Sequence, residues 1–224
     1  MKESLWSASN SLERKYWNIE QKSYTVSLLD HILHSMKKVL MILGHPHPEK
    51  SYANSAIIDA FTKKLDEGEK KNVEIRNLIE LYPAYRIDVK AEQDALLRTD
   101  VIVLQFPFYW YSVPAIMKLW IDDVLEYGFA YGSDGDKLHG KCFLLSFSAG
   151  WPSEAYAATG YNNFEIPDLL KPLIQTSNLI GTKYLEPIYT NSMVFIPGVF
   201  NTKEAIEASA WEHAERLLKT LRNI

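Results

Sequence analysis

Almost wholly apolar runs alternate along this chain with segments of helical periodicity. The runs are Val39–Leu43, Val101–Phe106 and Phe143–Phe147. A run that is apolar at nearly every position, and not at every second one, is typical of a strand covered on both faces. After the first run, Ile57 and Phe61 lie four positions apart, on one face of a helix. The pattern therefore predicts buried strands packed between helices.

Strands and helices are expected in strict alternation. In chain order they are a strand at Val39–Leu43, a helix at Ser51–Glu67, strands at Val73–Leu78 and Val101–Phe106 with a helix at Ala91–Arg98 between them, a helix from Pro114 to about Tyr127, a strand at Phe143–Phe147, a helix from about Pro167, a strand at Lys183–Tyr189 and a final helix capped by Thr202. Such alternation gives right-handed βαβ units. Five strands favour an α/β three-layer sandwich, with a parallel sheet in the flavodoxin-like order 2-1-3-4-5.

Ligands bind such sheets at the carboxyl ends of the strands, where the strand order reverses between the first and third strands. This rule points to three loops, which follow Leu43, Phe106 and Phe147. We therefore expect the chemistry of the chain to reside in these loops.

The first 35 residues differ from the rest. They are polar with scattered aromatic residues, and they lack the long apolar segment of a secretory signal. Met36-Lys37-Lys38 then leads into the first strand as the start of a chain would. We expect residues 1–35 to be an extension, its order left open, that adds no catalytic group, and residues 36–224 to form one α/β domain.

Composition excludes several classes of protein. The net charge is −4, and no basic stripe suggests nucleic-acid binding. No apolar stretch approaches the ~20 residues that span a bilayer. The single cysteine, Cys142, allows no intramolecular disulfide and suits a reducing cytoplasm. Cys142 itself is expected in the core.

The loop after the first strand has the features of an anion site. Ser51 is placed as the N-cap of the next helix, and Asn54 follows one turn later. Unpaired N–H groups and the helix dipole favour a phosphate there. His45 can donate to the same phosphate. His45 and His47 could also suggest a metal pair, but no nearby cysteine or carboxylate completes such a site, so we expect no metal.

The other two loops suit a flat ring. Four consecutive aromatic residues, Phe108 to Tyr111, lie between Pro107 and Pro114. They suit the isoalloxazine of a flavin, although such a cluster can equally form core or interface. After Phe147, the small residues Ser148, Ala149 and Gly150 let the backbone approach a ligand closely.

Two other kinds of site are disfavoured by motif. A hydrolase elbow needs Gly-x-Ser-x-Gly, and Ser146 occupies the first position. Neither a Walker loop nor a Gly-x-Gly-x-x-Gly sequence is present, so a phosphate would not be held in either of those ways.

Several motifs together resemble one known family. They are His45-Pro46-x-Pro48-x-x-Ser51-x-x-Asn54, Leu81-Tyr82-Pro83 with Ile87-Asp88 and Glu92-Gln93, Pro107 through Trp110-Tyr111-Ser112 with Pro114, Leu119-Trp120-Ile121-Asp122, Gly128-Phe129-Ala130-Tyr131-Gly132 and Leu138-His139-Gly140-Lys141. The segment from about Lys37 to Arg222 resembles the NAD(P)H:quinone oxidoreductase family of flavodoxin-like flavoproteins. Within the family it is most similar to the flavoprotein ancillary subunit of glutathione-gated potassium efflux systems. Residues 1–35 have no counterpart.

The resemblance implies a bound flavin, FMN or FAD, and assigns residues to it. It places His45, Ser51 and Asn54 at the flavin phosphate, Pro107, Phe108, Tyr109 and Trp110 along the isoalloxazine, and Ser148, Ala149 and Gly150 at the pyrimidine edge. It makes Tyr156 the active-site tyrosine, with the N–H groups of Ala149 and Gly150 beside it. It assigns Trp110, Tyr131 and Trp151 to the substrate pocket. Tyr131 matches an aromatic residue that reaches the partner subunit's site, which implies a homodimer.

Two positions depart from the family pattern. Trp151 stands where the family has the second glycine of its Thr-Thr-Gly-Gly loop, so the pocket is narrower or the loop is shifted. Asn162 stands where some relatives have a histidine, and an amide cannot shuttle a proton as an imidazole does.

The function that the resemblance implies is transfer of two electrons from NAD(P)H, through the bound flavin, to quinone-like acceptors by a ping-pong mechanism. Two alternatives stay open. One is a regulatory ancillary subunit of a potassium efflux transporter, and the other is a flavodoxin-type electron carrier. The expected location is the cytoplasm, with peripheral attachment at the inner membrane if a transporter partner binds.

Overall fold

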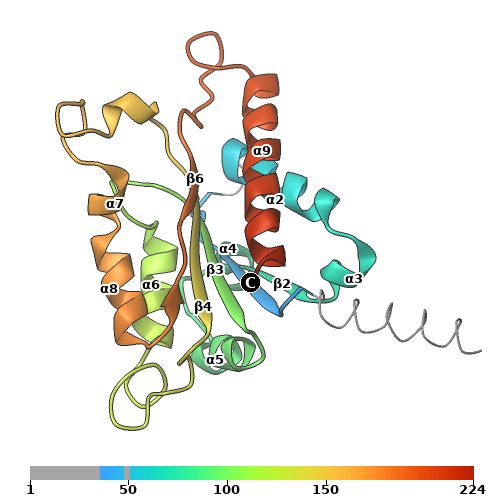
Figure 1. The fold of residues 1–224 in the computed structure, drawn as a ribbon, viewed down its shortest axis with the longest axis vertical. Helices are drawn as coiled ribbons and strands as arrows, with labels where there is room; N and C mark the ends of the chain where they lie inside the picture. The colour runs from blue at the N-terminus through green and yellow to red at the C-terminus, as the bar shows by residue number, and fades with distance from the viewer. Residues whose placement is uncertain (1–35, 48–50) are drawn as a thin grey trace, which may run out of the picture. The chain divides into compact units, whose positions relative to one another are not determined.

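A parallel sheet in the order β2-β1-β3-β4-β5 forms the centre of the fold (Figure 1). This computed structural model describes residues 36–47 and 51–224, so the expected extension at 1–35 lies outside the described residues. The strands are β1 (Val39–Leu43), β2 (Val73–Asn77), β3 (Val101–Pro107), β4 (Cys142–Ser148), β5 (Lys183–Tyr184) and β6 (Ile188–Thr190). The predicted strand order is confirmed.

Helices cover both faces of the sheet, which makes the predicted three-layer sandwich. Figure 1 shows α2 and α9 side by side on one face, with α6 and α8 on the other. The helices are α2 (Tyr52–Lys64), α3 (Glu67–Lys70), α4 (Leu78–Leu81), α5 (Val89–Leu97), α6 (Ala115–Val124), α7 (Ile166–Leu169), α8 (Lys171–Leu179) and α9 (Lys203–Arg222), with a 3-10 turn at Ser153–Ala155. Every residue of β3 and β4 is buried, as continuous apolar runs predict.

The prediction of one continuous last strand at Lys183–Tyr189 was wrong. The structure has two short strands, β5 and β6, which pair with successive parts of β4. Pro187 lies between them, and proline has no N–H to donate to the ladder. The fifth position of the sheet is therefore an interrupted strand.

Several helix ends also differ from the prediction. The first helix stops at Lys64 because Leu65 is extended, and Asp66 opens α3. The Asp66 carboxylate accepts the N–H groups of Gly68 and Glu69 in a capping box. The helix expected from Ala91 begins two residues earlier, since Asp88 is its N-cap. These caps are local polar contacts that apolar periodicity does not report.

One fully buried carboxylate ties three elements together. Glu92 on α5 accepts hydrogen bonds from Arg76 on β2, at 2.6 and 2.8 Å, and from Tyr82, at 2.5 Å. Its second oxygen accepts the indole N–H of Trp120 on α6 at 2.9 Å. Because each oxygen has a donor, the buried charge is compensated.

The loops that follow β4 and β6 lie at the top of Figure 1, at the carboxyl end of the sheet. No helix among the described residues combines the length and the apolar character needed to cross a bilayer.

Candidate functional site

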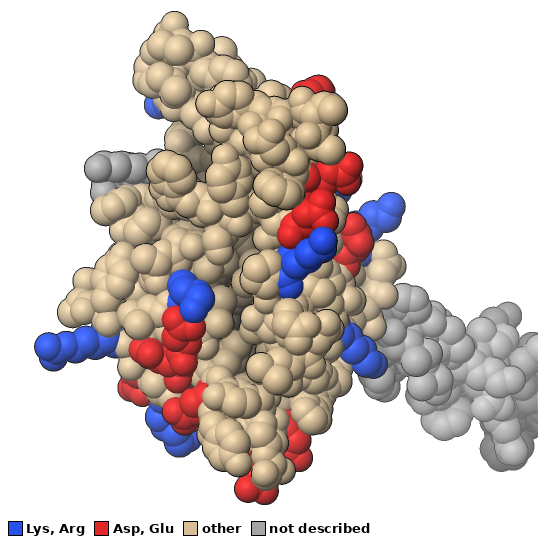
Figure 2. Space-filling view, turned by 90° about the vertical axis from the view of Figure 1, so that its left-hand side faces the viewer, with Lys and Arg blue, Asp and Glu red and all other residues tan. Residues whose placement is uncertain are grey.

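A cavity of about 540 Å³ lies at the carboxyl ends of β1, β3, β4 and β6. It is lined by His45, Ser51, Tyr52, Ala53, Asn54, Pro107, Phe108, Tyr109, Trp110, Tyr111, Ser148, Gly150, Trp151, Tyr156, Met193, Val194 and Phe195. All three loops singled out from the sequence contribute to it. The described lining contains no Asp, Glu, Lys or Arg, and few charged side chains lie at the top of the face in Figure 2. The described lining therefore carries no carboxylate, ammonium or guanidinium group and is rich in aromatic side chains.

The amino terminus of α2 forms one end of the cavity. Ser51 occupies the N-cap position, as predicted, and is buried, but its side chain makes no capping bond. The first helical bond runs from the Ser55 N–H to the Ser51 carbonyl, so the N–H groups before it are not used within the helix. A serine hydroxyl that makes no capping bond, together with N–H groups not used within the helix at its positive end, suits a phosphate.

His45 lies beside this helix end, with both ring nitrogens engaged. Its Nδ1 accepts the backbone N–H of His47 at 3.0 Å, and its Nε2 is 3.1 Å from the Tyr109 hydroxyl. If the ring is neutral, Nε2 carries the proton and donates to Tyr109. In this arrangement the imidazole links the loop after β1 to the aromatic loop, and the contact of His45 with a phosphate stays a prediction.

The aromatic loop is a tight turn with unusual backbone geometry. The Ser112 N–H donates to the Tyr109 carbonyl at 3.0 Å, and the two central residues, Trp110 and Tyr111, have φ of +49° and +64°. Positive φ at both central positions is typical of Asn-Gly turns and is strained for large side chains. We call Tyr109–Ser112 the aromatic turn. Trp110 at its tip is 92% exposed beside the cavity.

Side-chain bonds hold the aromatic turn at both ends. Tyr109 contacts His45 after β1, and the Tyr111 hydroxyl donates to Asn162 Oδ1 at 3.0 Å. Asn162 is buried, and its Nδ2 finds no partner among the described residues. Asn162 therefore anchors the turn in this chain.

The loop after β4 uses its backbone differently from the prediction for Ala149. The Ala149 N–H donates to the Thr190 carbonyl at 2.9 Å, and the Ala149 carbonyl accepts the Met193 N–H at 3.0 Å. This N–H is therefore engaged within the sheet and is not available to a ligand. Gly150 does line the cavity, and a Cβ there would lie 2.9 Å from Val194. A larger residue at 150 would therefore require the Val194 side chain to shift.

Tyr156 and Trp151 form another wall. Tyr156 is 8% exposed and packs near Phe108, with ring centroids 6.4 Å apart. Burial, with a smaller effect of Tyr111, raises the pKa of Tyr156, so its hydroxyl stays protonated and able to donate. Trp151 stacks on Tyr161 at 4.6 Å, which sets the indole beside the cavity mouth.

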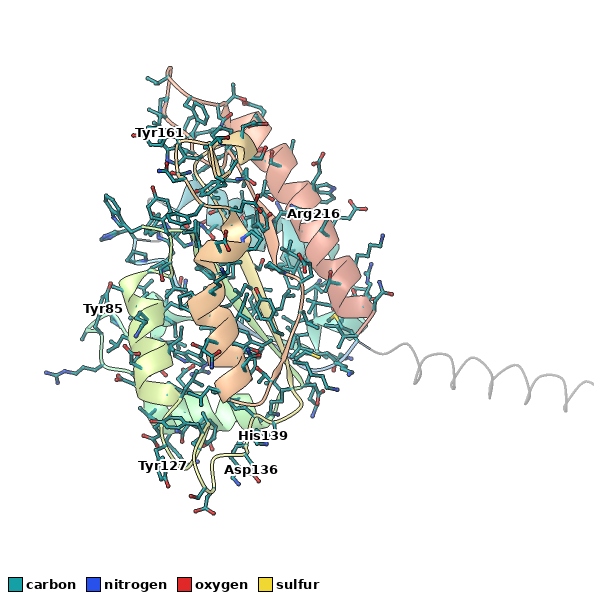
Figure 3. The ribbon with its side chains drawn as sticks, turned by 60° about the vertical axis from the view of Figure 1, so that its left-hand side comes forward. Tyr85, Tyr127, Asp136, His139, Tyr161 and Arg216 are labelled. Carbon is teal, nitrogen blue, oxygen red and sulfur yellow. The ribbon has the colours of Figure 1, made fainter. Side chains whose placement is uncertain are left out.

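Two predicted residues are absent from this lining: Ala149, whose neighbours Ser148 and Gly150 belong to it, and Tyr131, which lies elsewhere in the fold. The Tyr131 ring packs edge-on against Tyr127, 5.8 Å away, in the loop before β4. Figure 3 shows Tyr127 at the bottom of the molecule and Tyr161 at the top. Tyr131 therefore cannot line the pocket of its own chain, and its role in a partner's site stays a prediction.

The sequence analysis missed some residues at or behind the site. Met193, Val194 and Phe195 follow β6, so the rule on carboxyl ends would have found them if applied to the last strand. Gln105 and Ser146 are polar positions inside otherwise apolar strands, a signal that was present but not used. Among the described residues, no group of three or more His, Cys, Asp or Glu side chains is placed to hold a metal ion.

Residues 37–219 match a family model described as a flavodoxin-like fold. The chain is 39% identical, over 180 residues, to the glutathione-regulated potassium-efflux system ancillary protein KefF of Salmonella typhimurium, covering 80% of this chain and 95% of KefF.

Solved structures show the same similarity. General stress protein 14 of Treponema denticola, in complex with FMN, has a TM-score of 0.72 and 32% identity. The match covers 82% of this chain and 97% of the stress protein's chain. An NADPH-quinone reductase of P. pentosaceus has a TM-score of 0.66 and 26% identity, and the match covers 80% of this chain and 96% of the reductase.

Proposed function

The chain belongs to the flavodoxin-like family of the NAD(P)H:quinone oxidoreductases, and from this premise we propose that it transfers two electrons from NAD(P)H, through a bound flavin, to quinone-like acceptors. The observation that carries the proposal is the cavity where the α2 terminus, an aromatic wall and the small residues after β4 meet. Its volume is within the range of small-molecule sites. Similarity to the FMN-bound protein and to the NADPH-quinone reductase supports it.

The residues present fit FMN. Ser51 and the first N–H groups of α2 would hold the phosphate, with no ionised side chain needed from the described lining. Phe108 and the aromatic turn would lie along the ring, and Gly150 and Ser148 would meet its polar edge. When bound, the flavin supplies the hydride-accepting chemistry, and the protein supplies orientation.

The remaining task of the chain is to stabilise charge and exclude water. The Tyr156 hydroxyl, kept protonated by burial, can donate to an electron-rich atom in the cavity. Trp151 and Trp110, both in the cavity lining, would cover a bound ligand with aromatic surface. Asn162 is not among the cavity-lining residues and holds Tyr111, so the chain offers no imidazole relay at this position.

The test is the anaerobic absorption spectrum of the purified protein, before and after one equivalent of NADPH and then NADH. We expect a flavin band that bleaches with at least one nucleotide and recovers when a quinone is added. Absence of flavin after reconstitution with FMN or FAD would overturn the assignment of the cavity. A flavin that stays oxidised with both nucleotides would favour a carrier or regulatory role.

A regulatory role is the second candidate because KefF, an ancillary protein of a potassium efflux system, aligns over 95% of its length. In this case the chain would attach from the cytoplasm to a transporter in the inner membrane. Co-purification of the full chain with such a transporter tests this role directly. Reduction of quinones by the isolated chain, with no transporter effect, would reject it.

A further inference from the structure

A chain of hydrogen bonds runs behind the cavity, from the surface of α9 to Ser148. Its members are Arg216, Thr190, His213, Ser146, Gln105, Asn54 and Ser148. The distances between successive side chains lie between 2.6 and 2.9 Å. We call this the buried chain. Arg216, at its outer end, is exposed and labelled on α9 in Figure 3.

The outer half of the buried chain has one direction. The Arg216 guanidinium can only donate hydrogen bonds, and its Nη2 donates one to Thr190 Oγ1. The Thr190 hydroxyl therefore donates its own hydrogen to His213 Nδ1. The imidazole is fully buried beside the Arg216 cation, and both effects lower the pKa of His213, to about 3. A neutral ring that accepts at Nδ1 carries its proton on Nε2.

The inner half continues in the same direction. His213 Nε2 donates to Ser146 Oγ, and Ser146 in turn donates to Gln105 Oε1. The Gln105 amide donates to Asn54 Oδ1, and the Asn54 amide donates to Ser148 Oγ. The Ser148 oxygen thus accepts its hydrogen bond from Asn54, a member of the buried chain. Its own hydrogen finds no acceptor among the described residues and is available to the cavity that Ser148 lines.

We propose that the buried chain is a positioning device, in which Arg216 at the surface orients the Ser148 hydroxyl as a hydrogen-bond donor to a carbonyl-type acceptor on the ligand in the cavity. Bonds aligned in one direction polarise each other in a low-dielectric interior, and the cation stands at the donating end. The inference rests on the proposed function, because the acceptor is then the polar edge of a flavin. His213, Thr190 and Arg216 are positioning residues, since none lines the cavity.

The first experiment is a double-mutant cycle with FMN as the probe, on the full chain freed of flavin. Arg216→Met and Ser148→Ala should each raise the Kd for FMN about three- to tenfold, the loss expected for one net hydrogen bond. The double variant should bind no more weakly than Ser148→Ala alone, because Arg216 acts only through Ser148. Thr190→Val, which keeps the cation and breaks the chain, should match Arg216→Met. Lys219→Met, an exposed charge loss on the same helix, should leave the Kd unchanged.

Additive losses from Arg216→Met and Ser148→Ala would overturn the proposal, as would an unchanged Thr190→Val. Either result leaves the proposed function intact. A wild-type protein that binds neither FMN nor FAD would instead overturn both.

A second measurement needs no ligand. The ¹⁵N NMR shifts of histidine-labelled protein should show His213 as the neutral Nε2-protonated tautomer from pH 5 to pH 8. A neutral Nδ1-protonated ring would reverse the direction of the chain and reject the proposal.

Discussion

His213 is an ionisable side chain in surroundings that accept only its neutral form. Burial and the neighbouring Arg216 lower its pKa to about 3, whereas an unfolded histidine titrates near its ordinary value of about 6.5. The other groups that contact the ring are the uncharged hydroxyls of Ser146 and Thr190. Between these two pKa values, the unfolded chain binds a proton that the folded chain does not. The contribution of His213 to stability is therefore complete above pH 6.5 and falls as the pH falls.

This sign gives a measurable slope. In that window the free energy of unfolding should decrease by about 1.4 kcal/mol for each pH unit on account of His213. The slope is half of this value at pH 6.5 itself, so urea unfolding at pH 6.5 and 5.0 should show a loss of about 1.7 kcal/mol from this residue. In His213→Gln, which has no titrating ring, the decrease should be smaller by that amount. Parallel pH profiles for the two proteins would contradict the assignment.

Tyr156 should act as a donor to the ligand and not as a proton carrier at neutral pH. Since burial raises the pKa of its hydroxyl, it stays protonated throughout the neutral range. Tyr156→Phe should keep FMN and slow its reduction by NAD(P)H about tenfold, the effect of about 1.4 kcal/mol in the barrier. Stopped-flow single turnovers measure this step. An unchanged rate would remove Tyr156 from the mechanism.

Residues of the site were predictable where the loop itself carries the signal. Ser51, Trp110 and Gly150 line the cavity. They could be predicted because a helix start, an aromatic cluster and a run of small residues are each visible in the sequence. The sequence did not reveal that the Ala149 N–H donates to Thr190, because this bond is decided by the pairing of β4 with β6. His213 is 67 positions from Ser146, and such a contact exists only once the sheet and α9 have packed.

At the scale of elements, the aromatic turn stores strain next to the cavity. Trp110 has φ of +49° and makes no hydrogen bond among the described residues. Trp110→Asn should raise the free energy of unfolding by about 0.5–1 kcal/mol, because asparagine tolerates this backbone. The same change should raise the KM for a quinone severalfold, since an aromatic wall is lost. Urea unfolding and steady-state kinetics measure the two effects.

Tyr85 provides the matched control for this prediction. It also has positive φ, +56°, and Figure 3 shows it on the loop beside α6, outside the cavity lining. Tyr85→Asn should stabilise to a similar degree and leave the kinetics unchanged. If both variants changed KM equally, the kinetic effect would not come from the aromatic wall.

The positions of strands were easier to predict than their continuity or the ends of helices. β1, buried on both faces, has the bounds that its apolar run gives. The last strand was misjudged because one proline, Pro187, interrupts its ladder. Helix ends depend on side-chain caps such as those of Asp66 and Asp88, which act over two or three residues and leave the apolar periodicity unchanged.

At the scale of the whole molecule, the buried Glu92 carboxylate joins the sheet to the helical layer. Arg76→Met removes the cation from a carboxylate that is fully buried. We expect a loss of about 3–5 kcal/mol in the free energy of unfolding, as for other buried charges left without a partner. Arg98→Met, which removes an exposed pair with Glu74, should cost less than about 1 kcal/mol. Equal losses would contradict the view that the Glu92 carboxylate depends on Arg76 for charge compensation.

The last prediction concerns a molecule of two chains. Tyr131 lies far from the cavity of its own chain, so a role at a substrate pocket requires the partner's cavity in a homodimer. In that arrangement Tyr131→Ala should keep FMN bound and impair quinone reduction. Sedimentation should show a dimer for both the variant and the wild type.

Subunit mixing separates this arrangement from a general loss of structure. Tyr131→Ala and Tyr156→Phe damage different parts of a shared site, so a mixed dimer has one site with both defects and one with none. After exchange at equal concentrations, half of the dimers are mixed, and about a quarter of all sites should be intact. Activity should then exceed the mean of the two parent variants. Activity equal to that mean would show that no site is shared between the two chains. Tyr131 would then act within its own chain or have no role at a site.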